Sequence, residues 1–197
     1  MKKICPHIER GWAGSIGKPP VVKLVNVSVE YVREVRGLVG PDTMIVVRWV
    51  ESEQPLDNPQ VRAGQWMARH TNAMMAMTDY GRDRQIAFEG LNEIGDSEAA
   101  AYAAFERERL VSMHVLGLRS VVGNWSVGVP DLPTWASYRG VLDVMQPQDL
   151  VGLHEYWADE ADLLDPGHWH VGRFTLVPEL AGKQIIITEA GRDAFPD

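Results

Sequence analysis

Two glutamates, Glu93 and Glu189, each stand at the end of a short apolar run. The runs cover residues 85–91 and 184–189. Continuous apolar runs of this length are typical of strands buried on both faces, so we expect both carboxyl groups to be held on rigid strands. Two carboxyl groups that flank a glycosidic bond can cleave it, because one donates a proton to the leaving oxygen while the other attacks the anomeric carbon or activates water. The sequence therefore predicts Glu93 and Glu189 as a catalytic pair.

Apolar, β-branched runs of this kind recur along the chain, with longer amphipathic stretches between them. Six runs cover residues 20–26, 43–49, 85–91, 119–124, 150–155 and 184–189, and a weaker one covers residues 2–7. Helices are expected at 29–39, between a capping Ser28 and a terminating Gly40, and at 59–79, 98–116 and 134–145. Strands that alternate with helices predict a parallel α/β sheet with its helices outside. We expect one domain over residues 1–197.

The polar residues at the ends of these runs choose between two parallel architectures. The ends carry Asn26, Arg48 with Trp49, Asn92 with Glu93, Asn124 with Trp125, His154 with Glu155 and Tyr156, and Glu189. In a (β/α)₈ TIM-like barrel all of these ends meet on one face, whereas a doubly wound sheet binds ligands only near its switch point. Six polar ends therefore favour the barrel.

Three segments resemble strands of the clan A glycoside hydrolases, which are TIM-barrel retaining glycosidases. Residues 88–93 (FEGLNE) resemble strand four, which carries an Asn-Glu pair with the acid/base Glu. Residues 185–191 (IIITEAG) resemble strand seven, which ends in the nucleophile, and residues 153–157 (LHEYW) resemble strand six. The clan usually continues Asn-Glu-Pro, and here Ile94 replaces the proline. The resemblance covers residues 20 to 193 and implies a retaining glycosidase with Glu93 as acid/base and Glu189 as nucleophile.

The resemblance also implies roles for the neighbouring side chains. Asn92 would bind the sugar 2-hydroxyl, Tyr156 would hold Glu189, and Arg48 would keep Glu189 ionised by its opposite charge. His154 is a further candidate for the substrate site, and Trp49, Trp125 and Trp157 are candidate platforms for stacking a sugar. A carbohydrate is then the expected partner, with the two carboxyl groups about 5–5.5 Å apart and with pKa values separated by their environments.

Other interpretations stay open for several of these residues. Arg48 also fits a structural ion pair, and His154 fits a buried histidine with its hydrogen bonds satisfied. Glu89 faces the same side of its strand as Glu93 and is expected in a buried ion pair. His168 and His170, taken with His154, have metal-like spacing but lack a set of carboxylates to complete a site. The alternatives to a glycosidase are thus a degenerate barrel that binds carbohydrate without turnover, and a metal-dependent barrel hydrolase.

Composition narrows the partners and cofactors. A net charge of −8 leaves no basic stripe for a nucleic-acid backbone or an anionic membrane. Residues 11–18 (GWAGSIGK) lack both the dinucleotide and the P-loop pattern, so we expect no cofactor and no metal. The single cysteine, Cys5, excludes an internal disulfide. No signal peptide is visible, which makes a cytoplasmic location the default expectation.

The strand count falls short of a closed barrel. About seven candidate strands are present, and the eighth βα unit is missing, although closure needs eight. We therefore expect an incomplete barrel, either truncated at the C-terminus or completed by a partner. Because an open sheet exposes its edge strands to pairing, a homo-oligomer formed through that edge is a further expectation.

Overall fold

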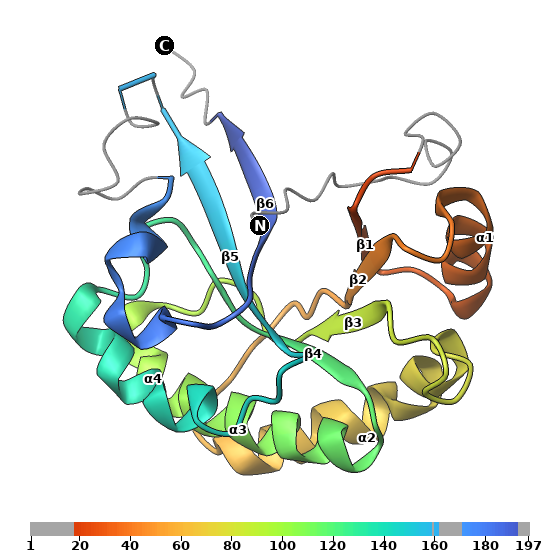
Figure 1. The fold of residues 1–197 in the computed structure, drawn as a ribbon. Coiled ribbons are helices and arrows are strands. Elements are labelled where there is room, and N and C mark those ends of the chain that lie inside the picture. The colour runs from red at the N-terminus through yellow and green to blue at the C-terminus, as the bar shows by residue number, and fades with distance from the viewer. Residues whose placement is uncertain (1–17, 159, 162–170, 193–197) are drawn as a thin grey trace.

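The computed structural model describes residues 18–158, 160–161 and 171–192 (Figure 1). Within these ranges six strands form one parallel sheet in the order β1-β2-β3-β4-β5-β6, so each strand pairs with its neighbours along the chain. The strands are β1 (Val21–Val25), β2 (Met44–Arg48), β3 (Ile86–Glu89), β4 (Arg119–Trp125), β5 (Leu150–Trp157) and β6 (Ile185–Arg192).

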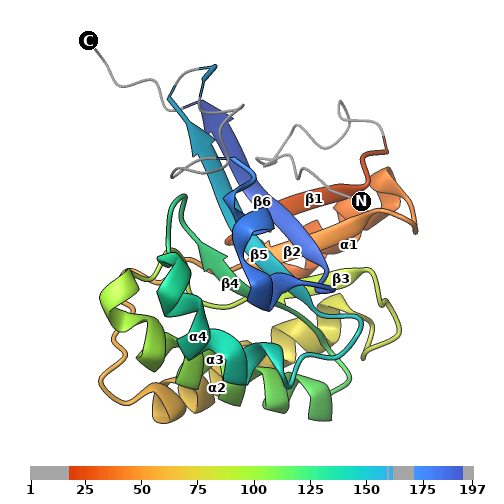
Figure 2. The same ribbon diagram turned by 60° about the vertical axis from the view of Figure 1, so that its left-hand side comes forward.

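Helices follow the strands and lie outside the curved sheet. They are α1 (Val29–Val39), α2 (Pro59–Met77), α3 (Ala99–Val115) and α4 (Trp135–Leu142), with short 3₁₀ helices η2 (Asp96–Glu98), η3 (Leu132–Thr134), η4 (Arg173–Leu176) and η5 (Pro178–Leu180). Figure 1 shows α2, α3 and α4 side by side beneath the sheet, and Figure 2 shows β5 and β6 projecting together beyond the other strands. No helix in the described ranges combines the length and apolarity needed to cross a membrane.

The prediction of an incomplete TIM-like α/β barrel is confirmed. All six strong apolar runs are strands, and α1 begins and ends where its capping residues predict. Ser28 Oγ accepts the backbone N–H of Tyr31 at 3.2 Å, and Gly40 ends the helix with a φ of 89°. The expected weaker strand at residues 2–7 and the segment 11–17 lie outside the described residues. Among the described strands β1 and β6 are the edges, and association through them stays a prediction.

Strand alternation divides the core into two layers. Inside the barrel lies a small apolar cluster, and its members are Val21, Met44, Val46, Ala87, Val121, Leu150 and Ile186. The alternate residues of the same strands face the helices and join a much larger cluster that includes Leu24, Phe88 and Trp66. Successive side chains of a strand point to opposite faces, so the interior positions beyond the small cluster are the ones that can reach a site at the carboxyl ends of the strands.

A buried polar network on α3 anchors the ends of β3 and β4. Arg109 donates to the carbonyl oxygens of Phe88 at 3.3 Å and Val121 at 2.9 Å, and it forms an ion pair with Glu106 at 2.6 Å. Tyr102 donates from its hydroxyl to the carbonyl oxygens of Leu91 at 3.1 Å and Gly123 at 2.7 Å. Side chains of α3 therefore fix the backbone at the ends of β3 and β4, because they donate hydrogen bonds to these four carbonyl oxygens.

Gly90 is the point at which this network comes closest to the strand backbone. A Cβ at this position would lie 2.3 Å from Glu106 Oε1 and 2.8 Å from Arg109 Nε, and both side chains are fully buried. We predict that Gly90→Ala lowers the free energy of unfolding by about 1–3 kcal/mol, because the buried ion pair must shift to admit a methyl group. Urea unfolding followed by circular dichroism measures the change.

The matched control for this substitution is Gly64→Ala, on the exposed face of α2. A Cβ there meets no atom within 4 Å, so alanine should leave stability unchanged or raise it by about 0.5–1 kcal/mol. Equal stabilities for the two variants would contradict the role given to Gly90.

Candidate active site

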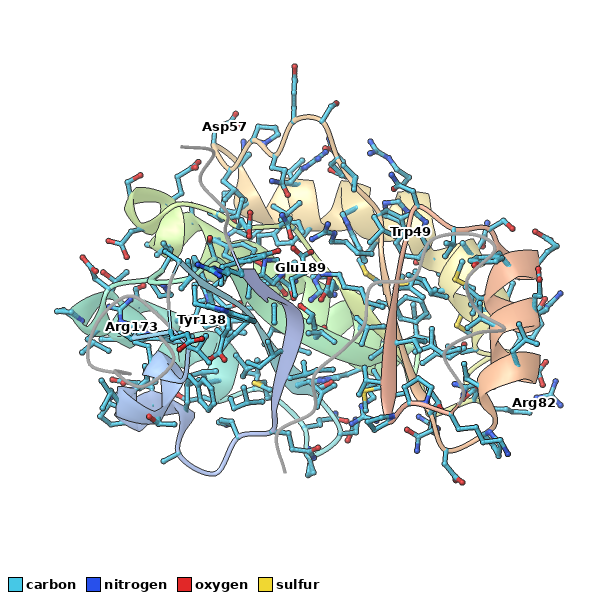
Figure 3. The ribbon with its side chains drawn as sticks, turned by 90° about the horizontal axis from the view of Figure 1, so that it is seen from above. Trp49, Asp57, Arg82, Tyr138, Arg173 and Glu189 are labelled. Carbon is cyan, nitrogen blue, oxygen red and sulfur yellow. The ribbon has the colours of Figure 1, made fainter. Side chains whose placement is uncertain are left out.

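The two predicted catalytic glutamates come together at the carboxyl ends of the strands. One carboxylate oxygen of Glu93, one of Glu189 and a ring nitrogen of His154 all lie within 4.8 Å of one another. Figure 3 shows Glu189 near the middle of the molecule, seen from above. The side chain of Glu93 is 35% exposed and that of Glu189 is 17% exposed, whereas His154 is fully buried. The site is thus a half-buried carboxylate pair on a buried floor.

Glu189 faces the interior because β6 carries a bulge. Leu153 of β5 pairs with Ile187, but the next residue, His154, pairs with Glu189, so Thr188 is an extra residue in β6. In a regular strand Thr188 and Glu189 would point to opposite faces, and a bulge redirects one of them. Both side chains consequently reach the same amine, Lys23 Nζ, at 3.5 and 2.8 Å. The sequence prediction placed Glu189 at the end of its strand, whereas the strand continues to Arg192.

Glu93 is not on a strand, contrary to the expectation. Strand β3 ends at Glu89, and Glu93 lies in the loop with a φ of 52°. Its backbone N–H donates to the carbonyl of Asn124 at 3.0 Å. Asn124 itself has a φ of 48° at the bulge in β4, and its side chain donates to Leu91 O at 3.3 Å. Left-handed conformations are costly for residues other than glycine and are found most often at functional sites. Glu93 is thus positioned by this loop conformation and its hydrogen bond to Asn124, and not by a strand.

Each carboxylate has its own set of partners. Glu189 accepts hydrogen bonds from Lys23 and Arg48 on Oε1, both at 2.8 Å, and from the Tyr156 hydroxyl on Oε2 at 2.8 Å. Glu93 Oε1 lies 2.7 Å from His154 Nδ1, which is also 3.6 Å from Glu189 Oε2. The contacts predicted for Arg48 and Tyr156 with Glu189 are therefore present.

The pKa values of both carboxyl groups are lowered, although by different causes. Burial alone raises the pKa of Glu189, but the charges of Lys23 and His154 and the hydrogen bonds from Lys23 and Tyr156 outweigh burial and bring it to about 2. For Glu93, the hydrogen bond from His154 lowers the pKa more than burial raises it. Both pKa values therefore move down, and the expectation that the environments separate them stays a prediction.

Asn92 is oriented by two neighbours, of which only Arg48 was predicted at the site. Arg48 Nη1 donates to Asn92 Oδ1 as well as to Glu189. Gln54 clamps the Asn92 backbone, accepting from its N–H at 2.7 Å and donating to its carbonyl at 2.9 Å. Nothing in the sequence context of Gln54 marks it as part of a site.

Lys23 is the other residue that sequence reasoning missed. It is fully buried on β1 and forms ion pairs at 2.8 Å with Glu89, also fully buried, and with Glu189. The ion pair expected for Glu89 is thereby confirmed. A signal for Lys23 was available, because a lysine inside the apolar run VVKLV must find a buried counter-charge.

The three candidate tryptophan platforms are not together. Trp125 is fully buried and packs against Tyr102, Trp135 and Tyr138, so its prediction as a sugar platform is wrong. Trp49 stacks on His70 with ring centroids 4.4 Å apart and packs against the helix-side core, toward α2 in Figure 3. Trp157, partly exposed at the end of β5, is the remaining candidate.

A metal ion fits this cluster poorly, although Glu93, His154 and Glu189 lie at ligand-like distances. Lys23 and Arg48 already occupy one oxygen of Glu189, and Tyr156 donates to the other. A divalent cation would stand beside two fixed positive charges. His168 and His170, the other histidines considered for a metal site, lie outside the described residues.

Comparison with known proteins adds a likeness of fold. No protein-family model matches the chain, and no curated protein matches it in sequence. The catalytic domain of a mannanase from Streptomyces sp. SirexAA-E is similar in structure, with a TM-score of 0.60, 15% identity, and coverage of 99% of this chain and 67% of that one. At this identity the likeness concerns the fold, and it agrees with the barrel expected from the clan A resemblance.

The lowered pKa of Glu189 predicts how stability depends on pH. A carboxyl group whose pKa falls from 4.5 in the unfolded chain to about 2 in the folded one stabilises the fold above about pH 4.5, and this contribution is lost as the pH falls toward 2. We expect Glu189→Gln to flatten the loss of stability between these pH values, as measured by urea unfolding at each pH. Glu34→Gln, on the exposed face of α1, should retain the slope of the parent protein; a Glu189→Gln slope equal to that of the parent would refute the assignment.

Proposed function

We propose that this protein is a glycoside hydrolase that cleaves its substrate with retention, with Glu189 as the nucleophile and Glu93 as the acid/base. The observation that carries the proposal is the approach of carboxylate oxygens of Glu93 and Glu189 to within 4.8 Å. Double displacement uses carboxyl groups about 5–5.5 Å apart, whereas inversion needs about 6.5–9.5 Å to admit a water molecule. The short separation therefore favours retention.

In the first step a Glu189 oxygen attacks the anomeric carbon as the bond to the leaving oxygen breaks and Glu93 protonates that oxygen. Lys23, Arg48 and Tyr156 keep Glu189 ionised and oriented. In the second step Glu93 takes a proton from a water molecule, which displaces Glu189 from the sugar. Asn92, oriented by Arg48 and Gln54, stands beside Glu93 where it can bind a sugar hydroxyl.

The proton for the first step belongs to Glu93 and His154 together. The lowered pKa of Glu93 means that its carboxylate form is favoured when His154 donates to it. His154 Nδ1 lies 2.7 Å from Glu93 Oε1. A proton can therefore pass between the two side chains along this hydrogen bond, and Glu93 delivers it to the leaving oxygen.

The substrate class is proposed from two features. The carboxylate pair is bordered by Asn92, which can hydrogen-bond a hydroxyl-rich ligand, and Trp157 is a partly exposed aromatic residue at the end of β5. The structurally similar protein from Streptomyces is a mannanase, so mannan and aryl mannosides are the first substrates to test, followed by other aryl glycosides.

We predict that Glu189→Gln lowers kcat/KM about 10³-fold or more on every glycoside, and that Glu93→Gln does so on glycosides with poor leaving groups. Glu189→Gln should form no glycosyl-enzyme with a fluoro-sugar, because no carboxylate remains to attack. Glu93→Gln should keep activity on aryl glycosides with good leaving groups, because these need no protonation. Release of the aryl group and mass spectrometry of the intact protein provide the two measurements.

Glu53→Gln is the matched control, because Glu53 is an exposed carboxylate in the nearby loop after β2. This variant should hydrolyse substrates like the parent protein. Normal turnover by both Glu93→Gln and Glu189→Gln would overturn the proposal. Saturable sugar binding by a parent protein that hydrolyses no glycoside would instead identify a binding protein built on the same barrel.

Removal of metals separates this mechanism from a metal-dependent hydrolase. Because the described site neutralises Glu189 with Lys23 and Arg48, we expect hydrolysis to continue unchanged after dialysis against EDTA. Loss of activity on dialysis and its recovery on adding a divalent cation would reverse the assignment of Glu93, His154 and Glu189 from a carboxylate pair to metal ligands.

A further inference from the structure

We propose that Lys23, anchored by Glu89, is the positioning residue that fixes Glu189 in its attacking orientation and maintains its negative charge. This inference rests on the proposed function, since it assigns a role toward the nucleophile. It is carried by a contact across the open side of the sheet. Lys23 lies on β1 and Glu189 on β6, the two edges of the described sheet, and their side chains meet at 2.8 Å.

The lysine cannot relax away from this position. Its amine is fully buried and contacts Glu89 Oε2 at 2.8 Å, Glu189 Oε1 at 2.8 Å and Thr188 Oγ1 at 3.5 Å. Glu89 is fully buried as well, and Lys23 is the cation paired with it among the described residues. A buried charge that loses its partner is strongly destabilising, so the Lys23–Glu89 pair is held together whether or not a ligand is bound.

Arg48 approaches the same oxygen of Glu189 from a different level of the site. Its side chain is 10% exposed and also donates to Asn92, which borders the sugar site. A bound sugar that engages Asn92 can therefore alter the Arg48 contact. Within the described residues Lys23 contacts Glu89, Thr188 and Glu189 and has no hydrogen bond to Asn92, so a ligand that engages Asn92 leaves the Lys23 contact in place.

The charges around Glu189 decide what Lys23 contributes. Lys23 on β1, Arg48 on β2, Glu93 after β3 and His154 and Tyr156 on β5 all face this carboxylate. Glu89 forms an ion pair with the same amine of Lys23, so the positive charge of Lys23 is shared between Glu89 and Glu189. Removing Glu89 alone should leave Glu189 ionised as before, whereas removing Lys23 and Glu89 together should leave Arg48 as the remaining permanent cation beside it.

The experiment compares Glu89→Gln with the double variant Lys23→Met/Glu89→Gln. The double variant removes both buried charges, so it avoids the unpaired Glu89 that Lys23→Met alone would leave. Two quantities are measured on each full-length protein: the pH dependence of kcat/KM on an aryl glycoside that the parent hydrolyses, and the titration midpoint of the Glu189 carboxyl carbon by ¹³C NMR. The Glu189 signal is identified by its loss in Glu189→Gln, and circular dichroism shows that each variant folds.

We expect the double variant to raise the Glu189 midpoint and the acidic limb of kcat/KM by about 1–3 pH units. At a pH below the new midpoint, kcat/KM should fall about tenfold for each pH unit by which the midpoint rises. Glu89→Gln should lower the Glu189 midpoint, because Lys23 then has Glu189 as its remaining carboxylate partner. A purely structural role for Lys23 predicts reduced stability with neither quantity moved, and a double variant that titrates like the parent overturns the proposal.

The NMR measurement separates this inference from the proposed function. If the parent protein hydrolyses no glycoside, the proposed function fails, but the midpoint of Glu189 still reports whether Lys23 maintains its charge. If the parent hydrolyses glycosides and the midpoint is unmoved in the double variant, the function stands and the role of Lys23 is refuted. If the double variant does not fold, Glu89→Gln decides, because a raised Glu189 midpoint there contradicts a Lys23 charge shared between the two carboxylates.

Discussion

The barrel interior is organised around one balance of charge. Two cations, Lys23 and Arg48, face two carboxylates, Glu89 and Glu189, and every pair that forms does so at 2.8 Å. Burying any of these charges alone would be prohibitive, whereas a network in which each has a partner is tolerated. Val21 and Ala87 of the apolar cluster precede Lys23 and Glu89 along β1 and β3, and Glu189 joins the network to Glu93. The network therefore separates the apolar interior of the barrel from the candidate active site at the carboxyl ends of the strands.

The backbone departs from regular geometry at several positions near the carboxyl ends of the strands. Bulges at Thr188 in β6 and at Asn124 in β4 insert one residue each. Asn26, Glu93 and Asn124 have positive φ angles just beyond or at the ends of their strands. The α3 network of Tyr102, Glu106 and Arg109 supports the segments before Glu93 and Asn124, because it binds carbonyl oxygens of β3, β4 and the loop after β3. Hydrogen bonds from α3 thus stabilise the backbone next to the residues with positive φ angles.

Glu189 and Glu93 differ in the charged groups that contact them. Permanent cations surround Glu189, so its charge persists to a pKa of about 2. The partner of Glu93 is His154, whose Nδ1 lies 2.7 Å from the carboxylate. A carboxylate held by cations suits the proposed nucleophile, and one hydrogen-bonded to an imidazole suits the proposed acid/base group. The two roles that we propose therefore differ in the kind of neighbour, although both pKa values are lowered.

Local chain chemistry was enough to predict the elements and their order. Apolar runs predicted all six described strands, and the caps at Ser28 and Gly40 predicted the limits of α1. Of the polar residues at the strand ends, Arg48, Asn92, Glu93, His154, Tyr156 and Glu189 do come together. These features depend on hydrogen bonds between near neighbours and on strand periodicity, which a sequence displays directly.

The use made of those side chains depends on contacts that form only in the folded barrel. Folding placed Glu93 in a loop, buried Trp125, brought Lys23 from β1 against Glu189 on β6 and clamped Asn92 with Gln54. Each outcome depends on a register shift or on a contact between residues far apart in the chain. A one-residue bulge reverses the face to which the following residue points, and no local pattern reveals where such a bulge will occur.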